Sequence, residues 1–117
     1  MSFSNTDIVF LQKGDISNKE IMTDEKVFVM VQGSRCGHCI NAKPGFIEAS
    51  RQVTNVMFAT IQSDGDESER ALSKELKIID PSIGGIPAYL LFNKGKYVTT
   101  YKGQRDAASI SKFLSDH

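Results

Sequence analysis

Both cysteines of the chain lie in one four-residue motif, Cys36-Gly37-His38-Cys39. The motif follows an apolar, strand-like run and opens a stretch with helical spacing. A cysteine at a helix N-terminus has a lowered thiol pKa, because free backbone N–H groups and the positive end of the helix dipole stabilise its thiolate. Cys39 comes three residues later, so its sulfur lies close enough to that of Cys36 to form a disulfide. The motif therefore predicts a thiol–disulfide pair, with Cys36 as the nucleophile and Cys39 as the resolving cysteine.

The residues around the two cysteines favour redox chemistry. Gly37 leaves room for another chain to approach the Cys36 sulfur. Arg35 and His38 place positive charge or hydrogen-bond donors beside the thiolate, which lowers the thiol pKa further. A lower pKa favours the dithiol form and makes the disulfide a stronger oxidant.

Three other interpretations of the cysteine pair are weaker. A structural disulfide over this spacing closes almost no loop and stabilises little. A zinc site needs four ligands, and only His38 and His117 remain to complete one. Two inert core thiols would not require a strand-to-helix junction. We therefore expect no metal and no organic cofactor.

Two elements position the motif. Residues 27–32 are β-branched, aromatic and apolar without alternation, which is typical of a strand buried on both faces of a sheet. Residues 37–53 have apolar side chains at helical spacing, including Phe46, Ile47 and Val53. Pro44 lies inside this predicted helix and is expected to kink it, because its nitrogen cannot donate to a backbone carbonyl.

The rest of the chain alternates between strand and helix patterns. Asp106 is expected to cap a final helix with Ala107, Ile110, Phe113 and Leu114 on one face. Strands separated by helices predict parallel pairing, and one tight turn at 93–96 predicts one antiparallel pair. The result is a single α/β domain, residues 1–117, with helices on both faces of a central mixed sheet. The other predicted strands are 8–11, 56–61, 88–92 and 97–101, the other predicted helices are 16–23 and 67–76, and the predicted loops are 63–68 and 80–86.

A second motif, Gly84-Gly85-Ile86-Pro87, precedes the strand that begins at Ala88. A proline at the start of a strand and close after glycine is compatible with a cis peptide bond, here between Ile86 and Pro87.

Together these features resemble the thioredoxin superfamily over nearly the whole chain. The resemblance rests on the buried strand before CGHC, Pro44 five residues after Cys39, the Gly-Ile-Pro-Ala segment that opens a strand, and the final amphipathic helix. It implies the thioredoxin fold. It also implies that Ile86 and Pro87 form a cis-proline loop that packs against the active-site sulfurs and pairs with the backbone of a bound substrate. We expect the substrate to contact Arg35, Gly85, Ile86 and Pro87.

The CGHC sequence resembles the catalytic domains of protein disulfide isomerase more than thioredoxins proper. Residues 101–105 also resemble the isomerase pattern, in which an arginine moves toward the active site and eases deprotonation of the second cysteine. Arg105 is the candidate for this role. The alternative is a solvated arginine just before the last helix.

The chain departs from the family pattern at three positions. Arg35 stands where the family has Trp or Tyr, Met30 replaces a buried carboxylate, and Thr60 takes the place of its lysine partner. Losing both charges together is consistent, because a lone buried lysine would be an unpaired buried charge. The resemblance therefore leaves deprotonation of Cys39 to water, Arg105 or His38.

The predicted function is that of a thiol–disulfide oxidoreductase, which reduces or exchanges protein disulfides through a mixed disulfide and takes part in electron transport and redox homeostasis. Its expected partners are protein disulfide substrates and a recycling system of the thioredoxin-reductase or glutathione type. Two alternatives remain: an oxidase or isomerase for a specialised partner, and a binding module with a vestigial redox pair.

Composition excludes other classes of protein. The chain has 117 residues, 40% of them apolar, with 14 basic and 14 acidic side chains, which is typical of a globular domain. Without a basic excess we expect no nucleic-acid partner. The longest apolar runs are far shorter than the roughly 20 residues of a membrane span, and no signal-peptide pattern is present. We therefore expect a cytoplasmic monomer.

Overall fold

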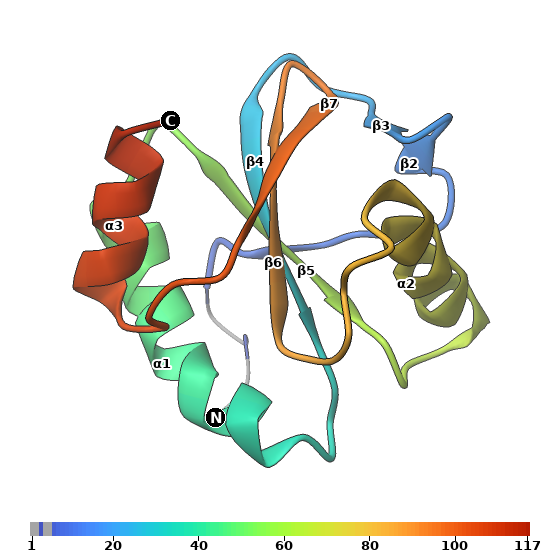
Figure 1. The fold of residues 1–117 in the computed structure, drawn as a ribbon, viewed down its shortest axis with the longest axis horizontal. Helices are drawn as coiled ribbons and strands as arrows, with labels where there is room; N and C mark the ends of the chain where they lie inside the picture. The colour runs from blue at the N-terminus through green and yellow to red at the C-terminus, as the bar shows by residue number, and fades with distance from the viewer. Residues whose placement is uncertain (1–2, 4–5) are drawn as a thin grey trace.

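The protein is built around a seven-stranded mixed sheet (Figure 1). The structure is a computed structural model that describes residue 3 and residues 6–117. The strands are ordered β1-β5-β4-β6-β7-β3-β2 across the sheet. They are β1 (Val9–Phe10), β2 (Ile16–Ser17), β3 (Glu20–Ile21), β4 (Lys26–Gln32), β5 (Met57–Gln62), β6 (Ala88–Asn93) and β7 (Lys96–Tyr101). The helices are α1 (Gly37–Gln52), α2 (Glu67–Ile79) and α3 (Ala107–Ser115).

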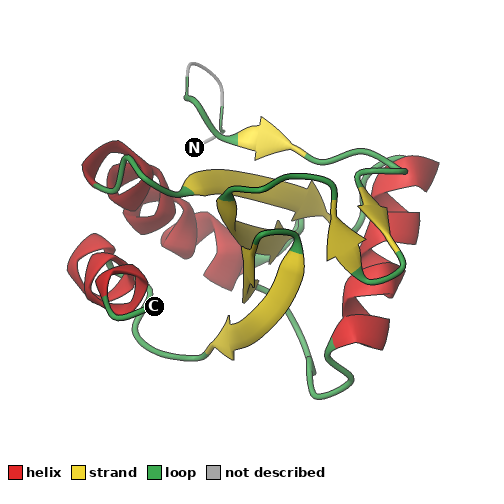
Figure 2. Ribbon diagram, turned by 90° about the horizontal axis from the view of Figure 1, so that it is seen from above, coloured by secondary structure: helices red, strands yellow, loops and turns green. Residues whose placement is uncertain are grey.

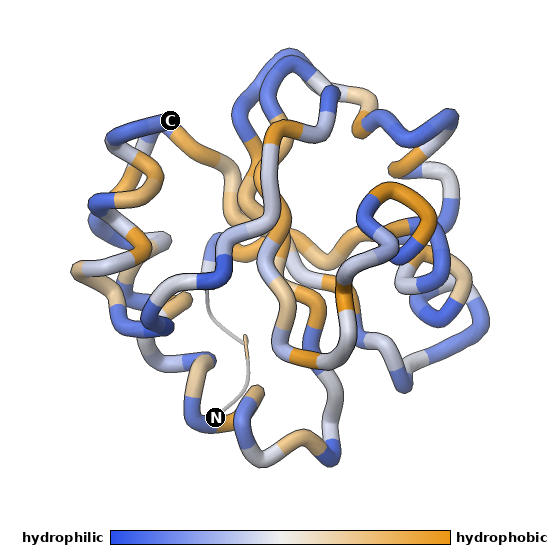
Figure 3. Tube along the Cα trace, in the orientation of Figure 1, coloured by the Kyte–Doolittle hydropathy of each residue, from blue (hydrophilic) through white to orange (hydrophobic). Residues whose placement is uncertain are grey.

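Strand β4 is the centre of the sheet, parallel to β5 and antiparallel to β6. Its residues 27–31 are at most 3% exposed, because helices cover both faces of the sheet. One face packs against α1 and α3, and the other against α2, as Figure 2 shows. Figure 3 shows the hydrophobic colour concentrated along these central strands. The α/β class with a central mixed sheet is confirmed.

The helix predicted at residues 16–23 is wrong. This segment forms a small hairpin in which Ile16 pairs with Ile21, and both side chains are buried. Asn18 and Lys19 turn the chain with φ values of 52° and 65°. Two consecutive left-handed residues match the twist of a two-residue hairpin, although neither residue is glycine.

Parallel pairing was predicted for strands separated by helices, and this is also wrong for β6. Although α2 precedes it, β6 runs antiparallel to β4. The physical reason is the loop at 80–87, which brings the chain back to the end of the sheet at which β4 ends. Strand β6 therefore starts beside the end of β4. The pairing of β6 with β7 is antiparallel, as predicted from the turn.

The helix ends follow their capping residues. Helix α2 runs three residues further than predicted, and Asp66 and Glu69 form a capping box at its start. Asp106 caps α3, as predicted, by accepting from the backbone N–H of Ser109. Within the described part of the chain, no helix has the length and apolar character that crossing a membrane requires.

Candidate active site

The CGHC motif lies at the junction between the end of β4 and the start of α1. Cys36 is the N-cap residue of α1, with extended backbone angles (φ −102°, ψ 108°). Its Sγ accepts a hydrogen bond from the backbone N–H of Cys39 at 3.1 Å. The sulfur therefore occupies the place of a capping oxygen, where helix N–H groups stabilise a thiolate.

The two cysteines form a disulfide, with their Cα atoms 5.1 Å apart. Their exposure differs: Cys36 is half-buried, whereas Cys39 is 0% exposed. A disulfide or thiol arriving from solvent therefore meets Cys36 first. This asymmetry is what a nucleophilic and a resolving cysteine require.

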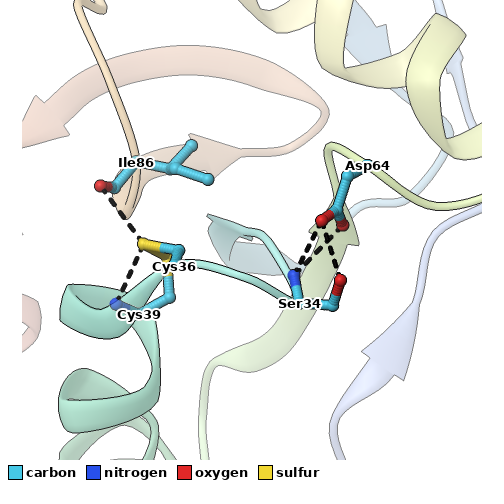
Figure 4. The surroundings of a disulfide bond; sticks show 5 residues. All are labelled: Ser34, Cys36, Cys39, Asp64 and Ile86. Carbon is cyan, nitrogen blue, oxygen red and sulfur yellow. Dashed lines mark hydrogen bonds between the residues drawn. A yellow bond between two sulfur atoms is a disulfide. The ribbon is translucent and has the colours of Figure 1, made fainter.

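The Ile86–Pro87 segment faces the disulfide, as Figure 4 shows for Ile86. The peptide bond between the two residues is cis. The carbonyl oxygen of Ile86 lies 3.6 Å from Cys36 Sγ. In the disulfide form Cys36 Sγ carries no proton, so this is a contact and not a hydrogen bond. After reduction, the Cys36 thiol can donate to the same oxygen. Gly33 permits the approach, because a Cβ there would lie 2.8 Å from Ile86 Cδ1.

An acidic residue anchors the loop before the motif. The Asp64 carboxylate accepts from the backbone N–H of Ser34 at 3.1 Å and from its Oγ at 2.8 Å (Figure 4). The backbone hydrogen bond from Ser34 is the main reason that the Asp64 pKa is lowered from 3.8. The sequence pattern alone did not predict this contact. The available signal was that Asp64 closely follows β5, whose carboxyl end lies beside that of its parallel neighbour β4.

The position of the missing family carboxylate is apolar and fully buried. Met30 and Thr60 are both 0% exposed and are paired in the β4–β5 register. Thr60 Oγ1 donates to the backbone carbonyl of Met30 at 2.9 Å. The buried Thr60 hydroxyl is thus satisfied by a backbone carbonyl, and neither position carries an ionisable side chain.

A groove of about 180 Å³ adjoins the cis-proline segment. It brings together three of the predicted site residues, Gly85, Pro87 and Arg105. Arg105 is exposed at this groove, and Arg35 and His38 are exposed on the active-site loop and first helical turn. Tyr89 also lines the groove. Burial raises the pKa of Tyr89 to about 12, against the opposing effect of the Arg105 charge.

No group of three or more His, Cys, Asp or Glu side chains that could hold a metal ion occurs among residue 3 and residues 6–117.

The sequence matches the family model described as Thioredoxin over residues 8–116. The chain belongs to the thioredoxin family. Within it, a thioredoxin-like protein, 453L, of Invertebrate iridescent virus 6 is 35% identical over 109 residues, covering 78% of this chain and 79% of the viral protein. In the present chain, Cys36 and Cys39 form a CXXC pair at disulfide distance.

A further relative and a solved structure with a similar fold extend the likeness. Protein disulfide-isomerase like 2-2 of Arabidopsis thaliana is 26% identical over 110 residues, which cover 94% of this chain but 23% of the plant protein. The crystal structure of thioredoxin f from spinach chloroplast superposes with a TM-score of 0.71 at 15% identity, covering 94% of this chain and 92% of the spinach chain. The thioredoxin fold predicted from sequence is confirmed.

Proposed function

We propose that this thioredoxin-family protein reduces or exchanges disulfides of protein substrates through a mixed disulfide with Cys36. The observation that carries the proposal is the arrangement of the pair. Cys36 is half-buried at the helix N-terminus, Cys39 is fully buried behind it, and the cis Ile86–Pro87 segment lies against the Cys36 sulfur.

The reaction follows ordinary thiol–disulfide exchange. The Cys36 thiolate attacks one sulfur of the substrate disulfide, and the other substrate sulfur leaves as a thiolate. Cys39, after losing its proton, attacks Cys36 Sγ and releases the first substrate sulfur. The substrate has gained two electrons, and the protein holds the Cys36–Cys39 disulfide. A reductase of the thioredoxin-reductase type, or glutathione, returns the two electrons.

The substrate backbone is proposed to lie along Gly85, Ile86 and Pro87, with Arg35 at the open side of the sulfur. Because Met30 supplies no proton acceptor, water, His38 or Arg105 must assist deprotonation of Cys39. Arg105 lines the same groove as Pro87, which supports a role for it beside the bound substrate.

A second candidate function differs in the direction of exchange. Oxidation or isomerisation of a specialised partner is favoured by Arg35 and His38, whose positive charge or donors beside Cys36 stabilise a thiolate and hence the reduced form. The likeness to a plant protein disulfide-isomerase supports this candidate too. A binding module with a vestigial pair has only the apolar Met30 position in its favour.

The test is a pair of serine variants in an insulin-reduction assay with dithiothreitol. Cys36→Ser is expected to abolish the acceleration, because no nucleophile remains at the half-buried position that a substrate reaches first. Pre-reduced Cys39→Ser, incubated with insulin after dithiothreitol is removed, is expected to accumulate mixed disulfides that non-reducing electrophoresis detects. Full activity of Cys36→Ser would contradict the proposal, and unchanged partner capture by this variant would favour the binding module.

A further inference from the structure

Gln32, the last residue of β4, carries a buried polar atom that the mechanism above does not use. Its side chain is 1% exposed, and its Oε1 is one of two buried side-chain polar atoms without a hydrogen-bond partner among the described residues. The other is the hydroxyl of Tyr89. Buried polar groups nearly always have a partner, and an unpaired one costs stability. The exception at Gln32 lies four residues before Cys36 and calls for a physical explanation.

The sheet directs the Gln32 side chain toward the active-site helix. Alternate residues of a strand share a face, so Gln32 lies on the face of Phe28 and Met30. Both belong to the apolar cluster that contains Ala42 and Phe46 of α1. The β4–β6 register ends with Val31 paired with Ala88, so Gln32 follows directly at the end of β4 where the cis-proline segment joins β6.

Cys39 lies on the side of α1 that faces the sheet, and its level can be compared with that of Gln32. It is 0% exposed and shares a helix face with Ala42 and Phe46, which follow it by three and seven residues. The Phe28 and Phe46 rings are 5.9 Å apart and fix the level of the helix on the strand. Measured along β4 from Phe28 toward the active site, Gln32 lies about 13 Å further on. Measured along α1 from Phe46 in the same direction, Cys39 lies about 10 Å further on.

In the disulfide, Cys39 Sγ has no hydrogen to donate. Reduction by two glutathione thiols adds one electron and one proton to each protein sulfur and yields glutathione disulfide, so that Cys39 gains an S–H group. We propose that Gln32 Oε1 is the acceptor for this S–H group, paired in the reduced protein and unpaired in the disulfide form. The proposal rests on the redox function proposed above and assigns Gln32 as a positioning residue for the resolving cysteine.

The consequence is a difference in stability between the two redox forms. The acceptor stabilises the dithiol, because a weak S–H donor is paired there. It destabilises the disulfide, because the same oxygen is left without a partner. Both effects favour reduction of the pair. Gln32 thus makes the disulfide a stronger oxidant, in the same direction as Arg35 and His38.

The test compares Gln32→Leu with the wild-type chain in glutathione buffers. After acid quenching, mass spectrometry measures the fractions of dithiol and Cys36–Cys39 disulfide and gives the equilibrium constant for reduction. We expect this constant to fall roughly three- to tenfold in the variant, a tenfold fall being about 30 mV for two electrons. Gln52→Leu is the matched control, since Gln52 is exposed near the far end of α1 and is expected to leave the constant unchanged.

A second variant and a second readout separate this proposal from a packing defect. Gln32→Met keeps an unbranched side chain of similar length and is expected to shift the constant in the same direction. Urea denaturation should show that each variant stabilises the oxidised form relative to the reduced form. An unchanged or increased equilibrium constant in the variants would overturn the role of Gln32. If instead neither the wild type nor the variants formed the disulfide at any glutathione ratio, the proposed redox function itself would fail.

Discussion

At the scale of single residues, the backbone N–H of Cys39 is placed to stabilise a Cys36 thiolate, whereas the Ile86 carbonyl can pair only with the protonated thiol. Such contacts depend on holding the loop before the helix in one conformation. Ser34, two residues earlier, is held by the Asp64 carboxylate through its N–H and its hydroxyl.

We predict that Asp64→Ala loosens the active-site loop. The Ser34 amide loses its acceptor, so its hydrogen exchange should become at least about tenfold faster, as expected for the loss of a charge-assisted hydrogen bond. Exchange measured by NMR on the oxidised protein tests this directly. Asp24→Ala, at an exposed position before β4, is the control. An unchanged Ser34 exchange rate in Asp64→Ala would contradict the anchoring role.

At the scale of elements, the close approach of α1 to the segment before α3 links the active-site helix to Arg105. Gly45 lies where α1 contacts the backbone of this segment. A Cβ at Gly45 would collide with the carbonyl oxygen of Arg105 and lie 3.2 Å from Asp106 Cα. The glycine is required for this approach, and not for an unusual backbone angle.

Gly45→Ala is therefore expected to destabilise the protein, by up to about 2 kcal/mol. Overpacking costs about 1–3 kcal/mol, and the better helix propensity of alanine returns only part of it. Urea denaturation measures the change. Gly37→Ala is the matched control within α1, because nothing lies within 4 Å of a Cβ there. Equal stabilities of the two variants would show that the segment moves away without cost.

Elements with a strong local signal were predictable from sequence, and contacts between distant segments were not. The apolar run of β4 and the helical spacing of α1 identified both elements around CGHC. The β2–β3 hairpin was missed because its turn uses Asn18 and Lys19, not glycine. The Asp64 anchor and the orphan Gln32 oxygen were missed because they depend on which strand lies beside which, and this information is absent from local periodicity.

At the scale of the whole molecule, acid stability depends on carboxylates that hold loops to the sheet. Asp80 accepts from Ser82 and from Thr100 Oγ1, which connects the loop before the cis-proline to β7. The hydrogen bonds from Ser82, followed by that from Thr100, lower the pKa of Asp80 from 3.8 to about 2.

The sign of the pH effect follows from this depressed pKa. A carboxyl group whose folded pKa lies below its unfolded value stabilises the fold above about pH 4, and loses this contribution as the pH falls toward about 2. Asp80→Asn should therefore show a flatter loss of stability between these pH values than the wild type. Urea midpoints measured from pH 2 to 6 test the prediction. Parallel profiles for the two proteins would contradict it.

Above all, Cys36 and Cys39 are proposed to form a working two-electron redox pair in this thioredoxin-family fold. The most direct test is the reduction potential of the wild-type pair, from the disulfide fraction at a series of glutathione ratios. We predict a two-electron titration with a midpoint between about −270 mV, typical of thioredoxin, and about −180 mV, typical of protein disulfide isomerase. Failure to form the Cys36–Cys39 disulfide at any ratio would contradict the claim and leave a binding module with a vestigial pair.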